Sequence, residues 1–374
     1  MRLLIFISSL RGGGAERVTV NLANHWATKG WDITVVTLSQ RSSDFYELHP
    51  AVKRIELELA GKSTNVLAAV WQNIHRLIVL RRVLRENQAD IALGMMNIPS
   101  VLLAMAAWRL PTLYTVGAEH IYPPQLPLGY LRDTLRCHTY GFLNAVTALT
   151  SEGKDWIETN TNAQRVMVIP NAVTWPLSGQ EPRLNPSALH QSERRLLLAV
   201  GRLDEQKGFD WLIEAFSNLE DRHPDWDLVI LGEGPSREKL EEQLRESGIE
   251  KRICLPGRAG NVAEWYESAD LFVMSSRFEG FPMTLAEAMA YGLAAVSFDC
   301  DTGPRDIIRH ELDGLLVPPG NVPELTAALD RLMSDDLTRQ RFAERAVEVR
   351  ERFSMERIAG MWEKLFEEIL LEQK

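Results

Sequence analysis

Two glutamates, Glu279 and Glu287, lie eight positions apart, with a turn and the start of a predicted helix between them. Glu287 has a structural alternative, because Thr284 and Glu287 have the spacing of a capping box that closes a helix N-terminus. Glu279 instead precedes a Gly-Phe-Pro turn that follows a short apolar run at residues 271–274. Open parallel sheets bind ligands beyond the carboxyl ends of their strands. The pattern therefore predicts a ligand site that contains the Glu279 carboxylate.

Two cations lie five positions apart near the start of another predicted helix. Arg202 follows the predicted strand at residues 195–200 within a Gly-Arg-Leu sequence, and Lys207 is followed by Gly208. A guanidinium and an ammonium group around a helix N-terminus can hold a diphosphate. The alternative is a pair of solvated surface cations, and the spacing alone leaves both open.

The third candidate is a run of three glycines, Gly12, Gly13 and Gly14, between a predicted strand and a predicted helix. Glycine amides at a helix N-terminus can approach an anion closely, and the helix dipole favours negative charge there. The dinucleotide-binding fingerprint fails, because Arg17 stands at its third glycine position and no acidic residue follows Leu38. The run is either an anion site or a plain connection between strand and helix.

These residues need parallel strands to bring them together, and the chain has the required alternation. Residues 2–8, 15–29 and 32–38 read as strand, helix and strand, which implies a right-handed parallel crossover. After residues 178–191, a proline-containing segment predicted to be a linker, the pattern restarts. Further strands are predicted at residues 91–93, 112–116, 145–149, 166–169, 195–200, 226–231, 253–256 and 271–274, and helices at residues 209–219, 237–247 and 263–268.

The predicted fold class is therefore α/β, with two Rossmann-like doubly wound domains. Residues 1–177 are predicted to form the first domain and residues 178–356 the second. The tail at residues 357–374 is apolar at helical spacing and is predicted to pack back on the first domain.

Composition and charge limit the class of protein. The 374 residues are 45% hydrophobic and 25% charged with a net charge of −10, which excludes collagen, a disulfide scaffold and bulk disorder. The three cysteines, Cys137, Cys254 and Cys300, are far apart, so we expect free thiols and no structural zinc. Residues 1–180 carry 17 Lys and Arg against 13 Asp and Glu, a net of +4, and the rest carry 24 against 38, a net of −14. No basic tract or nucleic-acid-binding motif is present, so a nucleic-acid partner is not expected.

The sequence also bears on location. No run reaches the ~18 uninterrupted apolar residues of a spanning helix. The N-terminal MRLLIFISSL fits a first strand better than a signal peptide, because a glycine run follows it in place of a small-residue cleavage site. We therefore expect a cytoplasmic protein.

The pattern over the whole chain resembles glycosyltransferase family 4. Glu279 and Glu287 match the E-x7-E motif of that family, whose members are retaining enzymes with the two-domain GT-B architecture. Further segments resemble family signatures in the same order, namely GGAER at residues 13–17, IPN at 169–171, GRL with KG at 201–208 and DGLLVP at 313–318. The sequence is similar to bacterial enzymes that build capsule, exopolysaccharide or lipid-linked oligosaccharide. The resemblance implies two domains that face each other across a cleft.

The resemblance also implies roles for single residues. Arg202 and Lys207 would hold the donor diphosphate, Glu279 the hydroxyls of the transferred sugar, and Glu287 the ribose hydroxyls. His120 resembles an active-site histidine that follows a strand of the first domain, although a lone histidine is often structural. The implied catalytic residues are His120 and Glu279, and the implied donor-binding residues are Gly13, Gly14, Arg202, Lys207, Arg258, Gly280, Phe281, Pro282, Met283, Thr284 and Glu287.

The remaining members of this set act mainly through the main chain. Gly13 and Gly14 would let the diphosphate approach the first domain. Amides near residues 281–283 would contact sugar and phosphate, and the main chain at Arg258 would lie beside the base.

The implied chemistry fits these residue types. A departing nucleoside diphosphate develops negative charge, which fixed cations and helix amides stabilise. No divalent metal and no cofactor are then expected, and the Asp-Cys-Asp sequence at residues 299–301 is predicted to cap the following helix. The resemblance favours a UDP-sugar donor and front-face attack with retention of configuration, in which the leaving phosphate helps to deprotonate the acceptor hydroxyl.

Residues 66–86 combine basic and apolar side chains. The basic ones are His75, Arg76, Arg81, Arg82 and Arg85, interleaved with Trp71, Ile74, Leu77, Ile78 and Leu84. Such a helix can lie on an anionic membrane, at the cytoplasmic face, or it can simply cover the sheet. Both interpretations stay open, and the net charge of +4 on this half favours a glycan acceptor that is lipid-linked, such as a polyprenyl diphosphate.

Two other functions are alternatives to sugar transfer. A phosphorylase or epimerase of the same architecture would need a cofactor lysine or a different set of carboxylates, and neither can be placed. A catalytically silent nucleotide-sugar-binding partner of a polysaccharide assembly complex would not need Glu279, Arg202 and Lys207, which are all present. We therefore predict a retaining, metal-independent glycosyltransferase.

Overall fold

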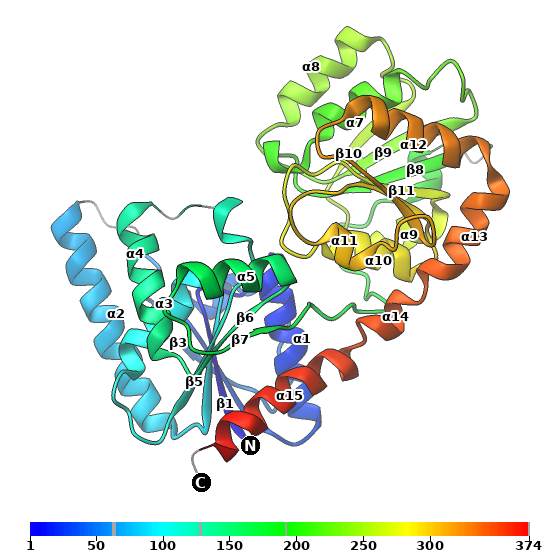
Figure 1. Ribbon diagram of the computed structural model, residues 1–374. Coiled ribbons are helices and arrows are strands. Elements are labelled where there is room, and N and C mark those ends of the chain that lie inside the picture. Colours follow the sequence, from blue (N-terminus) through cyan, green and yellow to red (C-terminus); the bar gives the residue numbers. More distant parts are fainter. Residues whose placement is uncertain (62–64, 126, 128, 191–192, 373–374) are drawn as a thin grey trace. The chain divides into compact units, whose positions relative to one another are not determined.

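A computed structural model describes residues 1–61, 65–125, 127, 129–190 and 193–372. The chain divides into two compact units (Figure 1), unit 1 with Met1–Ala172 and Met355–Lys374, and unit 2 with Val173–Ser354. The sequence predicts boundaries after residues 177 and 356, close to these positions. Residue 191 of the predicted linker and residues 373–374 of the predicted tail lie outside the described residues.

Unit 1 contains a seven-stranded sheet with the strand order β3-β2-β1-β4-β5-β6-β7. Its strands are β1 (Arg2–Ile7), β2 (Asp32–Thr37), β3 (Lys53–Glu56), β4 (Ile91–Met95), β5 (Tyr114–Ala118), β6 (Ala145–Ala148) and β7 (Val166–Val168). Its α-helices are α1 (Gly14–Thr28), α2 (Val66–Asn87), α3 (Asn97–Ala107), α4 (Tyr130–Thr139), α5 (Ser151–Asn160) and α15 (Met355–Leu371), and its 3-10 helices are η1 (Arg41–Ser43), η2 (Pro123–Gln125) and η3 (Tyr140–Phe142).

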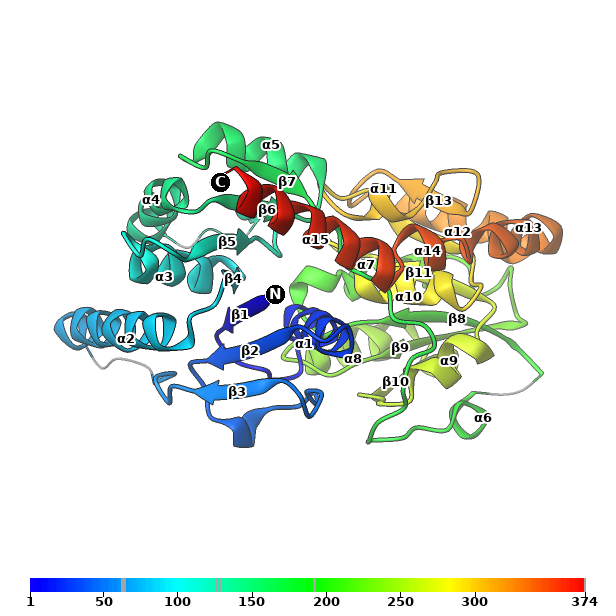
Figure 2. The same ribbon diagram turned by 90° about the horizontal axis from the view of Figure 1, so that it is seen from below.

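Helices cover both faces of this sheet, so its central strands are buried. Figure 2 shows α2, α3 and α4 on one face and α1 and α15 on the other. Five of the six residues of β1 are buried, which is the continuous apolar pattern of a parallel strand covered on both sides. Helix α1 ends in a Schellman motif, in which Gly30 has a φ of +80° and the Trp31 amide donates to the Trp26 carbonyl at 3.0 Å.

Unit 2 contains a six-stranded sheet with the strand order β10-β9-β8-β11-β12-β13. Its strands are β8 (Arg195–Val200), β9 (Trp226–Leu231), β10 (Ile253–Gly257), β11 (Leu271–Met274), β12 (Ala295–Phe298) and β13 (Gly314–Val317). Its helices are α6 (Pro186–Leu189), η4 (Glu205–Lys207), α7 (Phe209–Ser217), α8 (Arg237–Ser247), α9 (Val262–Ser268), α10 (Met283–Ala290), α11 (Pro304–Ile307), α12 (Val322–Ser334), α13 (Asp336–Ala346) and α14 (Val349–Arg352).

The core of unit 2 lies between the sheet and helices α7, α8 and α12, of which α7 contacts the other two. Leu212, Phe216 and Leu325 are fully buried there against strand residues such as Leu228 and Phe298. Each Å² of apolar surface buried in this core stabilises the unit by about 25 cal/mol. The packed core therefore holds the strand ends, and the loops that follow them, in place.

The predicted fold class is confirmed, and several predicted elements are displaced or missing. The strand predicted at residues 112–116 is Tyr114–Ala118, because a turn at Pro111 delays it. The linker prediction is wrong for α6, a short helix that begins at Pro186 with the Asn185 side chain as its N-cap. The strands β3, β12 and β13, each four residues long, were not predicted, and two of them, β3 and β13, form edges of their sheets.

Helix α15 belongs to unit 1, as predicted for the tail, and docks on α1 through aromatic rings and one carboxylate. The Phe366 ring lies 5.8 Å from the fully buried Trp26 ring. Glu363 Oε1 accepts hydrogen bonds from Trp26 Nε1 at 3.1 Å and from Lys29 Nζ at 2.7 Å. The last helix in the chain therefore closes the face of the first one.

We predict that Phe366→Ala lowers the free energy of unfolding of unit 1 by about 3–5 kcal/mol, because the buried ring leaves a cavity beside Trp26. Denaturant unfolding followed by tryptophan fluorescence measures it. Leu371→Ala on the same helix is the control, since that side chain is 65% exposed and its loss should change stability by less than about 0.5 kcal/mol. Equal stabilities of the Phe366 variant and the wild type would contradict this docking.

Candidate active site

The order of strands in unit 2 places two motif loops side by side. β8 and β11 are parallel neighbours, with Leu197 opposite Leu271, and the chain winds outward from them in opposite directions. Arg202 follows β8 and Glu279 follows β11, so both stand beyond adjacent carboxyl ends at the topological switch point. Open α/β sheets bind ligands at this point.

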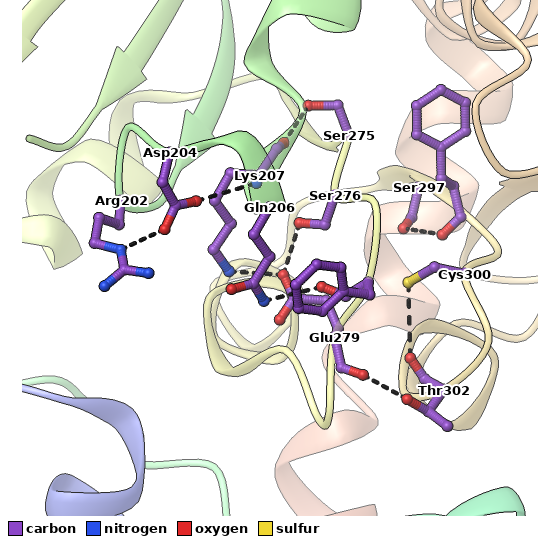
Figure 3. Close-up of polar contacts among 12 residues, drawn as sticks. Arg202, Asp204, Gln206, Lys207, Ser275, Ser276, Glu279, Ser297, Cys300 and Thr302 are labelled. Atoms are coloured by element: carbon purple, nitrogen blue, oxygen red, sulfur yellow. Dashed lines mark hydrogen bonds and ion pairs between the residues drawn. The ribbon is translucent and has the colours of Figure 1, made fainter. Parts of the chain in front are cut away.

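The two loops meet in a hydrogen-bonded ion pair. Lys207 Nζ donates to Glu279 Oε1 at 2.6 Å, and Ser276 Oγ donates to the same oxygen at 2.6 Å (Figure 3). The side chains of Lys207 and Glu279 are 20% and 8% exposed. The structure thus joins two residues, 72 positions apart, that the sequence analysis placed in separate motifs.

Main-chain contacts hold the same two loops together. Ser275 Oγ donates to the Lys207 carbonyl at 2.9 Å, Gln206 Nε2 to the Phe278 carbonyl at 2.9 Å, and the Arg277 amide to the Gln206 carbonyl at 2.7 Å. Gly208 has a φ of +59°, and a Cβ there would lie 2.1 Å from the Ser275 carbonyl oxygen. Only glycine fits this approach, so Gly208 is a packing requirement as well as the N-cap of α7.

A third loop, between β12 and α11, supports the Glu279 main chain. The Thr302 hydroxyl donates to the Glu279 carbonyl, and Cys300 Sγ lies 3.7 Å from the Thr302 carbonyl. The prediction that the Asp-Cys-Asp sequence caps the next helix is wrong. Gly303 is the N-cap of α11 without a side-chain bond, and Asp299 pairs with Arg305 at 2.9 Å.

The capping-box interpretation of Glu287 is also wrong. Helix α10 has Pro282 as its N-cap with no side-chain hydrogen bond, which leaves Thr284 inside the first turn. Pro282 has no N–H, so amides for a ligand come from Met283 onward. Glu287 is 2% exposed, and Tyr266 Oη lies 3.5 Å from its Oε2. The helix therefore presents an N-terminus without a side-chain cap and one buried carboxylate, close in sequence to Glu279.

Four other predicted donor residues lie in unit 2. Arg202 is 69% exposed and its guanidinium pairs with Asp204, whose other oxygen caps η4. Arg258 is exposed just after β10. Phe281 is buried against the Phe353 ring at 5.1 Å, and Gly280 precedes it in the same turn. Arg202 is thus tethered but open to a ligand, whereas the Phe281 side chain serves packing.

In unit 1, Gly13 is the N-cap of α1 and Gly14 its first residue, one position before the predicted helix start at residue 15. The Glu16 carboxylate folds over this end, and a Cβ at Gly13 would lie 2.3 Å from Glu16 Oε2. Burial raises the pKa of Glu16. The helix N-terminus therefore already has an acidic group beside it, and a role for these glycines in diphosphate binding stays a prediction.

His120 follows β5 at the carboxyl edge of the unit 1 sheet, directly after the buried Glu119. Burial lowers the pKa of His120 to about 4, so its imidazole is neutral at neutral pH and can hydrogen-bond a hydroxyl without carrying charge. Burial raises the pKa of Glu119 to about 7, against the attraction of Arg136, whose Nη1 lies 3.6 Å away. Tyr140 Oη donates to the same carboxylate.

Four residues at these two sites were not predicted from the sequence, namely Ser276, Thr302, Gln206 and Glu119. Each of the first three contacts the Glu279 loop, and Glu119 precedes His120. For Ser276 and Glu119 a signal was present, since a polar residue at the end of a buried strand lies on the ligand edge of a parallel sheet. Thr302 and Gln206 act through long-range contacts that the sequence does not reveal.

The unit 2 site can bind an anion beside a hydroxylated group. Exposed Arg202, Lys207 and the first amides of α10 offer positive charge, and Glu279 is an acceptor for hydroxyl groups. A comparison with solved structures shows the fold class. The chain is similar to the crystal structure of Anabaena HepE in complex with UDP, with a TM-score of 0.79 and 18% identity over 98% of this chain and 100% of that one. With its two parallel-sheet units and this likeness, the chain has the GT-B fold.

Sequence relatives identify the family. The model "Glycosyltransferase Family 4" matches residues 12–174, and "Glycosyl transferases group 1" matches residues 180–349. The lipopolysaccharide 1,6-galactosyltransferase of Salmonella typhimurium is 36% identical over 76% of this chain and 77% of its own length. The chain belongs to glycosyltransferase family 4, as its motifs indicate, and it is a glycosyltransferase.

The chain is also similar in sequence to two further bacterial proteins. A Campylobacter jejuni protein named GalNAc-alpha-(1->4)-GalNAc-alpha-(1->3)-diNAcBac-PP-undecaprenol alpha-1,4-N-acetyl-D-galactosaminyltransferase is 26% identical over 99% of both chains. An exopolysaccharide phosphotransferase of Streptomyces coelicolor is 31% identical over 83% of this chain, and the match spans 32% of that longer protein.

Because the pKa of Glu119 is raised in the folded protein, we predict that the free energy of unfolding depends on pH. Its folded pKa of about 7 exceeds the ordinary 4.5, so between these values the folded state binds a proton that the unfolded state has lost. The free energy of unfolding of the wild type should therefore fall, relative to Glu119→Gln, as the pH rises from 4.5 to 7, by on the order of 3 kcal/mol at most. The shift of His120 is present in both proteins and cancels.

Denaturant unfolding of the wild type and Glu119→Gln across pH 4.5–7.5 tests this. Glu158→Gln on α5 is the control. That side chain is 48% exposed, so the free energy of unfolding of this variant should change with pH in parallel with that of the wild type. Parallel pH profiles for the wild type and Glu119→Gln would show that Glu119 titrates normally.

Proposed function

We propose that the enzyme transfers a sugar from a UDP-sugar to a glycan or lipid-linked glycan acceptor of bacterial surface polysaccharide synthesis, with retention of configuration. The observation that carries the proposal is the Lys207–Glu279 ion pair, at 2.6 Å, at the switch point of unit 2. It sets a cation for phosphate directly beside an acceptor for sugar hydroxyls, and a nucleotide sugar carries these two groups next to each other.

Charge development explains how this site accelerates departure of UDP. The pyrophosphate gains negative charge as the bond to the sugar breaks, and positive groups fixed in advance lower the barrier. Arg202, Lys207 and the amides that follow Pro282 supply these groups from this chain, which supports a metal-independent step. The family resemblance and the UDP in the HepE complex support uridine as the base.

The contacts of Glu279 bear on the route by which retention, implied by the family resemblance, is reached. A double displacement needs a carboxylate that acts as a nucleophile. Glu279 Oε1 already accepts from Lys207 and Ser276, and these hydrogen bonds make it a poor nucleophile. This favours front-face attack, with Glu279 holding the sugar. His120, neutral in unit 1, is proposed to contact substrate hydroxyls.

A lipid-linked acceptor at a membrane surface is supported by helix α2. Five large apolar side chains on it are exposed, at spacings of three and four residues that place them on one helical face. They are Leu67, Val70, Trp71, Ile74 and Ile78, with exposed fractions of 82%, 54%, 70%, 43% and 60%. The name of the Campylobacter jejuni relative includes undecaprenol, which agrees with this proposal. Among the described helices none is long and apolar enough to span a bilayer.

The basic residues of α2 divide into two groups. Arg76 donates to the Leu59 and Gly61 carbonyls and Arg81 to those of Ala106 and Trp108, so both serve the fold. The remaining ones, His75, Arg82 and Arg85, are exposed. These three are the side chains that we propose meet anionic lipid at the cytoplasmic face of the membrane.

We predict that UDP-sugars raise the melting temperature of the wild type more than GDP-, ADP- or dTDP-sugars, and that EDTA leaves this shift unchanged. Lys207→Ala and Glu279→Ala should each lower the rate at which UDP is released from the donor by at least about 100-fold, because each removes charge complementarity at the reacting centre.

Lys239→Ala on α8 is the matched control, since Lys239 is an exposed lysine of the same unit outside the site, and it should react like the wild type. Near-normal turnover of either site variant would contradict the assignment. Loss of the UDP-sugar shift in EDTA would contradict metal independence alone.

We predict that Trp71→Gln combined with Ile78→Gln weakens binding to phosphatidylglycerol-containing vesicles by about 10-fold or more, because two exposed apolar side chains no longer enter the interface. Vesicle sedimentation measures it. Arg82→Glu with Arg85→Glu should weaken binding to anionic vesicles only, and Arg81 is left unchanged for its structural role.

Leu337→Gln is the control for this experiment. That side chain is 80% exposed on α13 of unit 2, and its replacement should leave sedimentation as in the wild type. Unchanged sedimentation of the α2 variants would refute the membrane contact without touching the donor assignment.

A further inference from the structure

The two carboxylate oxygens of Glu279 have different surroundings. Oε1 accepts from Lys207 Nζ and from Ser276 Oγ, both at 2.6 Å. Within the described part of the chain no hydrogen bond to Oε2 is formed. The side chain is almost buried, so a carboxylate with one satisfied and one open oxygen needs a ligand group or water to complete it.

We propose that Ser276 is a positioning residue that assigns the two oxygens of Glu279 to different tasks. Oε1 is anchored inside the protein, and Oε2 is presented to a hydroxyl group of the donor sugar. The inference rests on the proposed function of Glu279 in holding that sugar, and it adds the group that orients it.

Lys207 alone cannot hold this orientation once a diphosphate is bound. Its ammonium is a point charge on a flexible four-carbon stem, and its three N–H donors are shared between Glu279 and any phosphate. Ser276 differs in each respect. It is 1% exposed, it lies two residues after the end of β11, and its single O–H donor is already directed at Oε1. When Lys207 turns toward phosphate, Ser276 keeps the carboxylate in place.

The main chain beneath Glu279 is held by other residues. The Thr302 hydroxyl donates to the Glu279 carbonyl, and Gln206 Nε2 donates to the Phe278 carbonyl at 2.9 Å. Removal of the Ser276 hydroxyl therefore leaves the loop in position and frees only the carboxylate. The consequence is specific: recognition of the sugar is weakened, whereas recognition of the diphosphate is not.

Ser276→Ala tests this by calorimetric titration with UDP and with the UDP-sugar that stabilises the wild type most. Hydrogen bonds to charged groups correspond to a factor of roughly 10 to 100 in an equilibrium constant. We expect affinity for the intact UDP-sugar to fall by about 10-fold or more, and affinity for UDP to change by less than about 2-fold. Retained UDP affinity also reports that the variant is folded.

Three comparison variants sharpen the result. Ser297→Ala removes another buried hydroxyl of unit 2, which donates to the Phe298 carbonyl at 2.8 Å, and it should bind both ligands like the wild type. Ser276→Thr keeps the hydroxyl and should bind the UDP-sugar more tightly than Ser276→Ala. Lys207→Ala should weaken both ligands.

An equal loss of UDP and UDP-sugar affinity in Ser276→Ala would overturn the inference, and so would no loss of either. A wild-type chain that binds neither ligand would instead contradict the proposed donor itself, so the two failures are told apart by the wild-type titration.

Discussion

Parallel pairing of the strands is the constraint on which the rest of both units depends. Every described pair of neighbouring strands is parallel, so all carboxyl ends of a sheet lie at one edge and each connection between successive strands must return the chain to the opposite edge. In unit 2 the neighbours β8 and β11 are joined through two outer strands, which is why loops far apart in sequence meet. The site is a consequence of strand order before it is a consequence of any single side chain.

The electrostatics of unit 2 differ between the two edges of its sheet. At the amino edge, Arg195 makes a bidentate pair with Asp336 at 2.6 and 2.7 Å, and both groups stay partly exposed. At the carboxyl edge, Lys207 and Glu279 are mostly withdrawn from water, and such a pair regains little of its desolvation cost unless hydrogen bonds complete it. The Ser276 hydroxyl supplies one such bond. A costly pair at the ligand edge is better explained by binding than by stability.

Local sequence signals predicted many of the secondary-structure elements. The contacts that depend on residues far apart in the sequence were not predicted. The apolar period predicted β8, β9, β11 and α8 with their observed bounds, because strongly periodic segments are decided by their own residues. The spacing of Thr284 and Glu287 led to a wrong capping-box interpretation. A capping box needs its threonine at the N-cap position, whereas the N-cap of α10 is Pro282, two residues before Thr284. Thr302 and Gln206 were missed since their partner, the Glu279 loop, is reached only through the fold.

Helix α2 shows why two interpretations of one segment could not be separated by sequence. Its 22 residues extend roughly 33 Å, whereas the five residues of the following strand β4 extend only about 17 Å. The C-terminal half covers the sheet through Leu80 and Leu84, which are buried in the core of unit 1. On another face of the helix, the apolar side chains between Leu67 and Ile78 stay exposed. The helix is therefore both an amphipathic cover of the sheet and the carrier of an exposed apolar face, so each of the two interpretations describes one of its faces.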